Sequence, residues 1–215
     1  MNVKKIVISY ISSLYDYQKT IALINQTSAS GIHVDLMDGK YVAAKNFDIN
    51  SLPDYFLYNQ KSLDIHAMLN NPEVILPDLI KLRPECIYIH PKTTDLILNI
   101  YKSLELENIK RGLAINPDEE ITCYEHLFPF VDRILLMSVV PGKGGQQFLE
   151  TTKERLAKLL ILKAKYNFEI FIDGGINDLT IKKVKEADGF VSGSYVCQSD
   201  DYEQQITKLK QEVSS

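Results

Sequence analysis

The chain has 215 residues, of which 45% are hydrophobic, enough to bury one sizeable core. Its 24 basic and 28 acidic residues give a formal charge of −4 and are mixed along the chain, so there is no basic footprint for nucleic acid or an anionic membrane. No segment approaches the roughly 18 continuous apolar residues of a membrane span. We therefore expect a single domain over residues 1–215, without nucleic-acid or membrane partners.

Neither the N-terminal segment nor the cysteines indicate export. The first apolar stretch is short, contains Ser9 and lacks a small-residue cleavage site, so it predicts a first strand and not a signal peptide. Cys86, Cys123 and Cys197 are odd in number, far apart and without a C-x-x-C pair. This pattern predicts neither a disulfide framework nor a zinc-thiolate site. We expect buried free thiols in a protein of the reducing cytoplasm.

Short runs rich in β-branched residues recur along the chain, and most are followed by a longer segment with helical periodicity. The expected strands are Lys5–Ser9, Gly31–Leu36, Ser62–Ala67, Cys86–His90, Arg111–Ile115, Arg133–Ser138, Glu169–Ile172 and Gly189–Ser192. The expected helices are Asp16–Gln26, Glu73–Leu82, Asp95–Leu106, Thr151–Tyr166, Leu179–Glu186 and Tyr202–Glu212, with a weaker one over Glu119–Phe128. The segment Tyr41–Asn59 is expected to be a loop with a short helix.

This alternation of strands and helices implies parallel strands joined by helical crossovers. An open doubly wound sheet fits the same alternation. Eight units in 215 residues, with no G-x-G-x-x-G after the first strand, favour closure into a barrel. The predicted fold is therefore an α/β, single-domain (β/α)8 TIM barrel.

Polar residues at the carboxyl ends of the strands are the first candidates for a site, because the loops there form the active-site face of such a barrel. His33 and Asp35 lie two apart on one expected strand, so both side chains point to one face. His66 and Asp173 end two other expected strands. One histidine at a strand end is usually an ordinary polar residue, but two imidazoles and two carboxylates on one rim indicate a site for one divalent metal ion: Zn²⁺, Fe²⁺, Mn²⁺ or Co²⁺.

Two other histidines serve as comparisons for this ligand set. His90 also ends a strand and lies beside the site, and we expect it outside the set of ligands. His126 falls within a helical segment, and we expect it at the surface.

Glycine clusters follow the last three expected strands, where this fold commonly binds phosphate through bare backbone amides. The residues concerned are Gly142, Lys143, Gly144, Gly145, Gly174, Gly175, Gly193 and Ser194. Tight turns need glycine in any case, so each cluster alone is weak evidence and the three together are stronger. Lys143 adds a charge there, although a lysine in a loop is usually only solvated.

Three methionines lie beside these segments: Met37, Met68 and Met137, each within two residues of an expected strand end. Core filling is the default explanation for a buried methionine. A soft apolar collar around a reactive intermediate is the alternative.

With these features the sequence resembles the ribulose-phosphate 3-epimerases. The resemblance covers nearly the whole chain and rests on segments in matching order and spacing: His33–Gly39, Asp64–Met68, Gly112–Pro117, Met137–Gln146, Asp173–Gly175 and Gly193–Ser194. It implies a (β/α)8 barrel whose metal ligands are the two histidines and two aspartates named above. It further implies that Ser9 contacts the sugar, that the three methionines line the intermediate and that the glycine clusters hold the phosphate. A homo-oligomer is implied by this likeness alone.

The sequence departs from the family pattern around the expected sugar pocket. Ile8 and Ala67 stand where the family has Pro and Leu, Ala43–Ala44 replaces Pro-Asn, and Lys143 replaces an aromatic residue. None of these changes removes an expected metal ligand or an expected acid or base. They therefore bear on which substrate is bound more than on which reaction is catalysed. The tract Ile89–Thr93 also resembles allulose-6-phosphate 3-epimerases, which act on a six-carbon sugar phosphate.

The expected chemistry is inversion of the carbon next to a ketone, which needs one acid/base group on each face. Asp35 and Asp173 take these roles, and the metal stabilises the enediolate as a Lewis acid. The leading hypothesis is epimerisation of D-ribulose 5-phosphate to D-xylulose 5-phosphate in the pentose phosphate pathway, with a small-molecule sugar phosphate as the partner. The alternatives are the same reaction on D-allulose 6-phosphate and a barrel that binds a sugar phosphate without turning it over. A decarboxylase or aldolase would need a lysine at a strand end, and none lies inside the expected rim.

Overall fold

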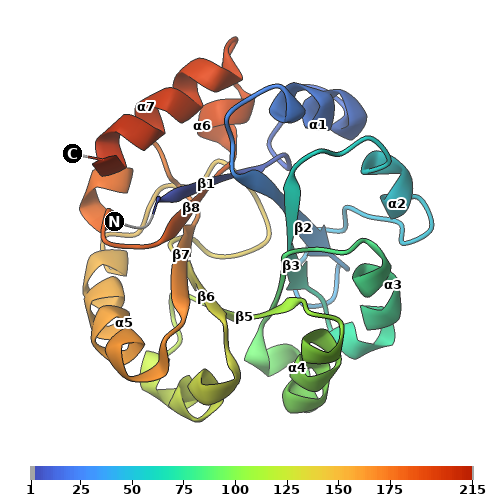
Figure 1. Cartoon of the computed structure of the whole chain (residues 1–215), viewed down its shortest axis with the longest axis vertical. Coiled ribbons are helices and arrows are strands. Elements are labelled where there is room, and N and C mark those ends of the chain that lie inside the picture. Colours follow the sequence, from blue (N-terminus) through green and yellow to red (C-terminus); the bar gives the residue numbers. More distant parts are fainter. Residues whose placement is uncertain (1–2, 215) are drawn as a thin grey trace.

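Eight parallel strands form the centre of the molecule, in a computed structural model that describes residues 3–214. They are β1 (Lys5–Ser9), β2 (Gly31–Met37), β3 (Ser62–Met68), β4 (Cys86–Ile89), β5 (Lys110–Ile115), β6 (Arg133–Met137), β7 (Glu169–Asp173) and β8 (Gly189–Ser192). Neighbours pair in chain order and β8 pairs with β1, so the sheet closes into a ring with the helices outside it (Figure 1). The predicted (β/α)8 TIM barrel is confirmed, while residues 1, 2 and 215 of the expected domain lie outside the described part of the chain.

The outer layer consists of α-helices and shorter 3-10 helices. The α-helices are α1 (Tyr17–Asn25), α2 (Leu52–Tyr55), α3 (Leu76–Lys81), α4 (Ile97–Leu106), α5 (Thr152–Tyr166), α6 (Ser194–Cys197) and α7 (Tyr202–Ser214). The 3-10 helices are η1 (Pro72–Val74), η2 (Pro91–Thr93), η3 (Ile121–Phe130) and η4 (Ile181–Val184). The short helix expected between residues 41 and 59 is α2, whereas α6 was not expected. None of the helices within residues 3–214 is long and apolar enough to cross a membrane.

Two expected helices differ from the structure for local reasons. The segment Glu73–Leu82 is divided into η1 and α3, because Pro77 lacks the N–H needed to continue a preceding ladder and fits the first turn of a new helix. The segment Glu119–Phe128 is a 3-10 helix that begins only at residue 121. Glu119 belongs to the turn before it, since its carboxylate accepts from the backbone N–H of Asn116 at 2.9 Å.

The helix expected over Leu179–Glu186 is replaced by the single 3-10 turn η4. Asn177 and Thr180 explain the difference. The Asn177 side chain accepts from the backbone N–H groups of residues 179 and 180 at 2.9 Å, and the Thr180 hydroxyl accepts from the Asn177 N–H at 2.9 Å. The side chains thus compete with the backbone and keep this stretch in a turn.

The cysteines are free thiols, as expected, but not all are buried. Cys86 and Cys197 are buried, and Cys123 is exposed. The expectation of three buried thiols is therefore wrong for Cys123. It lies on the outer side of η3, whose buried residues are Ile121, Leu127 and Phe128.

Strand alternation separates the barrel interior from the layer between the strands and the helices. In β4, Cys86 and Tyr88 face the interior cluster, while Ile87 and Ile89 pack in the outer core. The outward residues of β2 are likewise in the outer core, which leaves His33 and Asp35 on its inward face. The period of two therefore puts the candidate ligands of β2 inside the barrel.

A cluster of charged side chains closes the amino-terminal end of the barrel. Arg133, at the start of β6, is wholly buried, and its Nη1 donates to the two Asp64 carboxylate oxygens at 3.0 and 2.9 Å. The same guanidinium donates to Glu85 at 2.6 Å and to Glu169 at 3.0 Å. Lys110 donates to both glutamates at 3.1 Å. Buried charges are tolerated here because every one has a charged, hydrogen-bonded partner.

Acid is expected to weaken the contribution of Glu85 to stability. Burial alone would raise the pKa of Glu85, but Arg133, Lys110 and Lys5, whose Nζ lies 3.0 Å from the Glu85 carboxylate, outweigh it and lower the pKa below its ordinary value of about 4.5. A lowered folded-state pKa means that the contribution is complete above the unfolded-state value and is lost as the pH falls below it. Asp64 contributes with the opposite sign, because burial raises its pKa although Arg133 opposes the rise.

Urea unfolding of the wild-type chain and of Glu85→Gln at pH 7 and at about pH 3.5 tests this expectation. The wild-type chain should lose more stability on acidification than the variant, because the variant has no carboxylate to protonate at this position. Glu154→Gln, at an exposed position of α5, is the matched control. An equal acid loss in Glu85→Gln and the wild-type chain would contradict the expectation.

Candidate functional site

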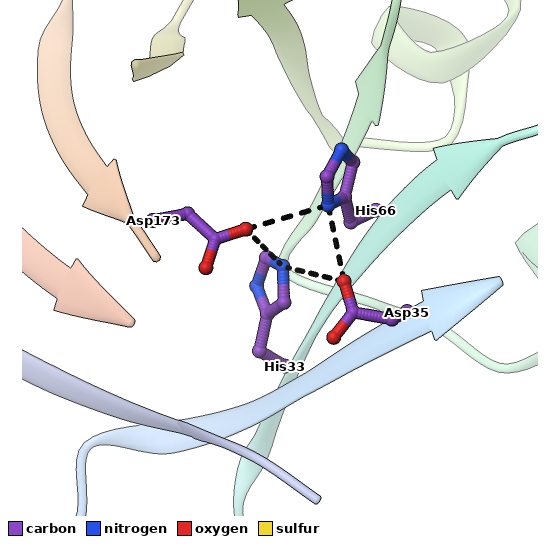
Figure 2. Close-up of side chains that lie close together, drawn as sticks. All are labelled: His33, Asp35, His66 and Asp173. Carbon is purple, nitrogen blue, oxygen red and sulfur yellow. Dashed lines mark hydrogen bonds and ion pairs between the residues drawn. The ribbon is translucent and has the colours of Figure 1, made fainter. Parts of the chain in front are cut away.

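Four side chains converge inside the barrel at the carboxyl ends of its strands (Figure 2). His33 and Asp35 come from β2, His66 from β3 and Asp173 from the end of β7. One nitrogen or oxygen of each residue lies within 4.8 Å of the corresponding atoms of the other three. His66 Nδ1 is 3.1 Å from Asp35 Oδ1 and 3.5 Å from Asp173 Oδ2, and His33 Nε2 is 3.6 and 3.7 Å from the same two oxygens. The structure therefore brings all four expected ligands together.

Asp35 is held from both sides by neighbouring residues. The register of β2 and β3 places it directly opposite His66. Its Oδ2 accepts from the Ser9 hydroxyl at 2.6 Å, which leaves Oδ1 directed toward the cluster. The Asn46 amide donates to the Asp35 carbonyl at 2.8 Å and accepts from the Met37 N–H at 2.9 Å, so it clasps the end of the strand. These bonds fix the direction in which the carboxylate points.

Asp173 is held through its backbone. The Ser138 N–H and hydroxyl both donate to the Asp173 carbonyl at 2.8 Å, and the same hydroxyl reaches the Gly174 carbonyl at 2.6 Å. The end of β7 is thus tied to the residue that follows β6. The Asp173 carboxylate points into the cluster, toward the two histidines (Figure 2).

The charges of the cluster shift the pKa of two members. Burial alone would lower the pKa of His66, but its interactions with Asp173 and Asp35 outweigh burial and raise the pKa to about 9. Burial likewise opposes ionisation of Asp35, yet His33 and His66 hold the pKa of that carboxyl below its ordinary value. Positive charge at this point is therefore strongly favoured.

The four side chains of the cluster fit a divalent metal ion, because they do not meet one another's hydrogen-bonding needs. Both ring nitrogens of His33 are buried without a hydrogen-bond partner among the described residues, since 3.6 and 3.7 Å are too long for one. A buried polar atom left unpaired costs free energy, and a cation between the four residues would satisfy His33 Nε2. Two imidazoles and two carboxylates suit Zn²⁺, Fe²⁺, Mn²⁺ or Co²⁺. Such an ion would also replace the proton on His66.

A cleft opens above the cluster. Its lining includes Asp35, His66 and Asp173, together with Ser9, Met68, Met137, Gly142, Lys143, Gly144, Gly145, Gly174, Gly175, Gly193 and Ser194. Of the expected site residues, His33 and Met37 do not line it, and both are buried. The cleft also includes residues that were not expected to bind the substrate: Ile11, Ser12, Ile176 and Val191, and, from the segment Met137–Gln146 that carries the resemblance, Val139, Pro141 and Gln146. Ser12 was detectable as a polar residue just after the first strand.

The two comparison histidines lie as expected. His126 is exposed on η3, and His90 stands outside the ligand cluster. His90 nevertheless touches a ligand, because its Nε2 lies 2.8 Å from Nε2 of His66. The position of His90 at a strand end predicts that it lies near the site, but no pattern in the sequence predicts this contact.

Comparison with known proteins decides the family. The model of the ribulose-phosphate 3 epimerase family matches residues 5–197. The chain belongs to the ribulose-phosphate 3-epimerase family. The resemblance seen in the sequence segments is thus confirmed, and the His/Asp cluster is consistent with a divalent metal site in a member of this family.

Individual relatives agree with this family. A ribulose-phosphate 3-epimerase of Helicobacter pylori (strain J99) is 32% identical over 188 residues, which cover 86% of this chain and 87% of that protein. One of Mycobacterium bovis is 29% identical over 191 residues, covering 87% and 83%. Among solved structures, KGPDC from Streptococcus mutans has a TM-score of 0.74 at 11% identity, covering 99% of this chain and 98% of that one. This last likeness supports the fold alone.

Metal binding to the cluster is expected to stabilise the fold. At a Co²⁺ or Zn²⁺ concentration 100 times Kd, a metal that binds only the folded state adds about 2.7 kcal/mol. Calorimetric unfolding of the chelator-treated protein, with and without added ion, measures the gain. His33→Ala should lose most of it, and His126→Ala, at an exposed histidine, should keep it. Equal stabilisation of His33→Ala and the wild-type chain would place the metal elsewhere.

Proposed function

We propose that this member of the family epimerises a ketose phosphate at C3, interconverting D-ribulose 5-phosphate and D-xylulose 5-phosphate. The observation that carries the proposal is the placement of two carboxylates, Asp35 and Asp173, in one cleft and one cluster, on strands separated by β8 and β1. Inverting a carbon next to a carbonyl requires loss of a proton on one face and its return on the other. Two carboxylates approaching from different strands meet that requirement.

Asp35 and Asp173 act as the acid/base pair. In one direction Asp35 takes the C3 proton and Asp173 supplies the new one, and in the reverse direction the roles exchange. Ser9 orients Asp35 through the bond to Oδ2 and faces the sugar from the cleft wall. Met68 and Met137, each 2% exposed, give that wall an apolar part that keeps water from the reacting carbon. Met37 is buried at the end of β2 and does not line the cleft, so it has no direct contact with the substrate in this proposal.

His33, Asp35, His66 and Asp173 would hold one divalent ion: Zn²⁺, Fe²⁺, Mn²⁺ or Co²⁺. When bound, the ion supplies Lewis-acid stabilisation of the negative charge that develops on the C2 oxygen of the enediolate. Because the two imidazoles are neutral and the two carboxylates balance the charge of a divalent ion, the occupied cluster would carry no net charge.

The glycine loops after β6, β7 and β8 form the phosphate-binding part of the cleft, together with Lys143 and Ser194. Close approach of the backbone is built into these loops. A Cβ at Gly144 would lie 1.8 Å from the Ser12 hydroxyl, and Gly175 has φ +63° with the Phe148 backbone nitrogen 2.7 Å from where its Cβ would be. Bare amides at such positions can reach phosphate oxygens, and the grip aligns the reacting carbon. Lys143 supplies positive charge to the same end of the cleft.

The names of the relatives support the pentulose substrate, since both proteins described above are called ribulose-phosphate 3-epimerases. With this substrate the protein acts in the pentose phosphate pathway. We propose further that it is a cytoplasmic protein and that it forms a homo-oligomer. D-allulose 6-phosphate is the alternative substrate, because Lys143, in place of the family's aromatic residue, lines the cleft. Analytical ultracentrifugation tests the oligomeric state.

The substrate is tested by incubating the metal-loaded protein in D₂O with ribulose 5-phosphate and, separately, with allulose 6-phosphate. NMR follows deuterium at C3 and the appearance of each epimer. Faster turnover of the pentulose supports the proposal, and faster turnover of the hexulose selects the alternative. No exchange with either substrate, across the four metals, would contradict an epimerase and leave a sugar-phosphate-binding barrel.

A further inference from the structure

His66 uses both ring nitrogens, and each faces a different partner. Nδ1 is directed at the two aspartates, and Nε2 lies 2.8 Å from Nε2 of His90. Both rings are 0% exposed, with their centroids 5.0 Å apart. This contact is therefore a dry, short hydrogen bond between two imidazoles, one of them an expected metal ligand.

The position of the shared proton follows from what a metal requires. Two ring nitrogens at this distance must have one N–H and one lone pair between them, because two lone pairs or two N–H groups would repel. His66 Nδ1 can bind a cation only through its lone pair, so in the neutral ligand the proton is on Nε2. His90 Nε2 must then be the acceptor, and the proton of His90 lies on its Nδ1.

The surroundings of His90 hold its ring in place for this contact. The His90 carbonyl accepts from the Thr93 N–H at 3.0 Å and from the Thr93 hydroxyl at 2.8 Å, which fixes the backbone after β4. The Tyr41 ring packs on the imidazole at a centroid distance of 4.9 Å, and the Tyr41 hydroxyl accepts from the Asn116 amide at 2.8 Å. His90 Nδ1 has no hydrogen-bond partner among the described residues. Among the described residues, the contact with His66 is thus the only hydrogen bond of the His90 ring.

We propose that His90 is a positioning residue for the metal centre. Its Nε2 accepts the ring N–H of His66, and this bond holds His66 in the tautomer and orientation that present Nδ1 to the metal. His90 itself lies outside the ligand cluster and does not line the cleft. The inference rests on the metal site of the proposed function. An acceptor behind a histidine ligand is worth roughly 10- to 100-fold in metal affinity.

Three variants test the inference through binding of Co²⁺, followed by visible absorption of the protein without substrate. His90→Phe keeps a flat ring but removes the acceptor, and we expect its Co²⁺ affinity to fall by about 10- to 100-fold. His90→Gln offers an amide oxygen at the distance of Nε2 and should recover most of the affinity. His126→Phe makes the same replacement at an exposed histidine and should bind as the wild-type chain does. Wild-type affinity and spectrum in His90→Phe would overturn the inference.

A second measurement needs no variant and decides the matter if His90→Phe does not fold. In the Zn²⁺-loaded wild-type chain, ¹⁵N NMR of the histidine rings should show a slowly exchanging proton on His66 Nε2. A bare His66 Nε2 in that state would overturn the inference while leaving the metal site intact. A wild-type chain that binds none of the four metals would instead remove the metal centre of the proposed function, and this inference with it.

Discussion

Replacing Asp35 or Asp173 with asparagine is expected to lower epimerisation of ribulose 5-phosphate by about 10²- to 10⁴-fold, the usual contribution of a positioned acid or base. Asparagine keeps the shape of the side chain and one oxygen toward the cluster, but it does not take up a proton at neutral pH. The loss should appear in kcat more than in KM, because the phosphate grip is unchanged.

The two variants should differ in a way that shows which face each carboxylate serves. With one carboxylate left, the epimer whose C3 proton faces it still exchanges with D₂O, but C3 is not inverted. Asp35→Asn and Asp173→Asn should therefore each exchange a different epimer, as followed by NMR with both pentulose phosphates. Co²⁺ binding to each variant, measured in parallel, separates a lost base from a lost ligand.

Asp118→Asn is the matched control, since Asp118 is exposed in the loop after β5 at the same end of the barrel. It should epimerise at the wild-type rate. Inversion at the wild-type rate by either Asp35→Asn or Asp173→Asn would contradict the two-carboxylate mechanism.

The largest effect on stability is expected at Arg133, far from the cleft. Arg133→Met should lower the free energy of unfolding by about 3–5 kcal/mol, because it leaves Asp64 buried without its cation. The Asp64 side chain is 3% exposed, and both of its oxygens accept from this guanidinium. Such a loss is a large part of the 5–15 kcal/mol that stabilises a typical protein. Urea unfolding at pH 7 measures it.

A double variant separates the unpaired charge from the lost packing. Arg133→Met combined with Asp64→Leu replaces the pair by apolar side chains and should recover much of the stability, as in other buried ion pairs. A single Arg133→Met that costs less than about 1 kcal/mol, the scale of an exposed ion pair, would show that the pair is solvated.

Local patterns in the sequence were sufficient for the strands and for most of the helices. Short apolar runs, several of them rich in β-branched residues, marked all eight strands, because the strands of a parallel sheet are buried on both faces. The predicted helices were wrong where side chains compete with the backbone for hydrogen bonds. Asn177 and Thr180 keep the segment before η4 in a turn, and Glu119 binds back to the turn before η3. The helical periodicity of apolar residues in a sequence does not reveal such side-chain hydrogen bonds.

The candidate site, too, could be predicted from local sequence patterns only in part. The sequence by itself determined that His33 and Asp35 share one face of a strand, since the side-chain period of two is local. Only the closed barrel decided that Asp173, on the seventh strand, lies 3.5 Å from His66 on the third. The contact of His66 with His90 and the burial of Arg133 among carboxylates also depend on strand register and closure, which no local pattern encodes. A pattern along one strand assigns a face, whereas distances between faces are set by how the sheet closes.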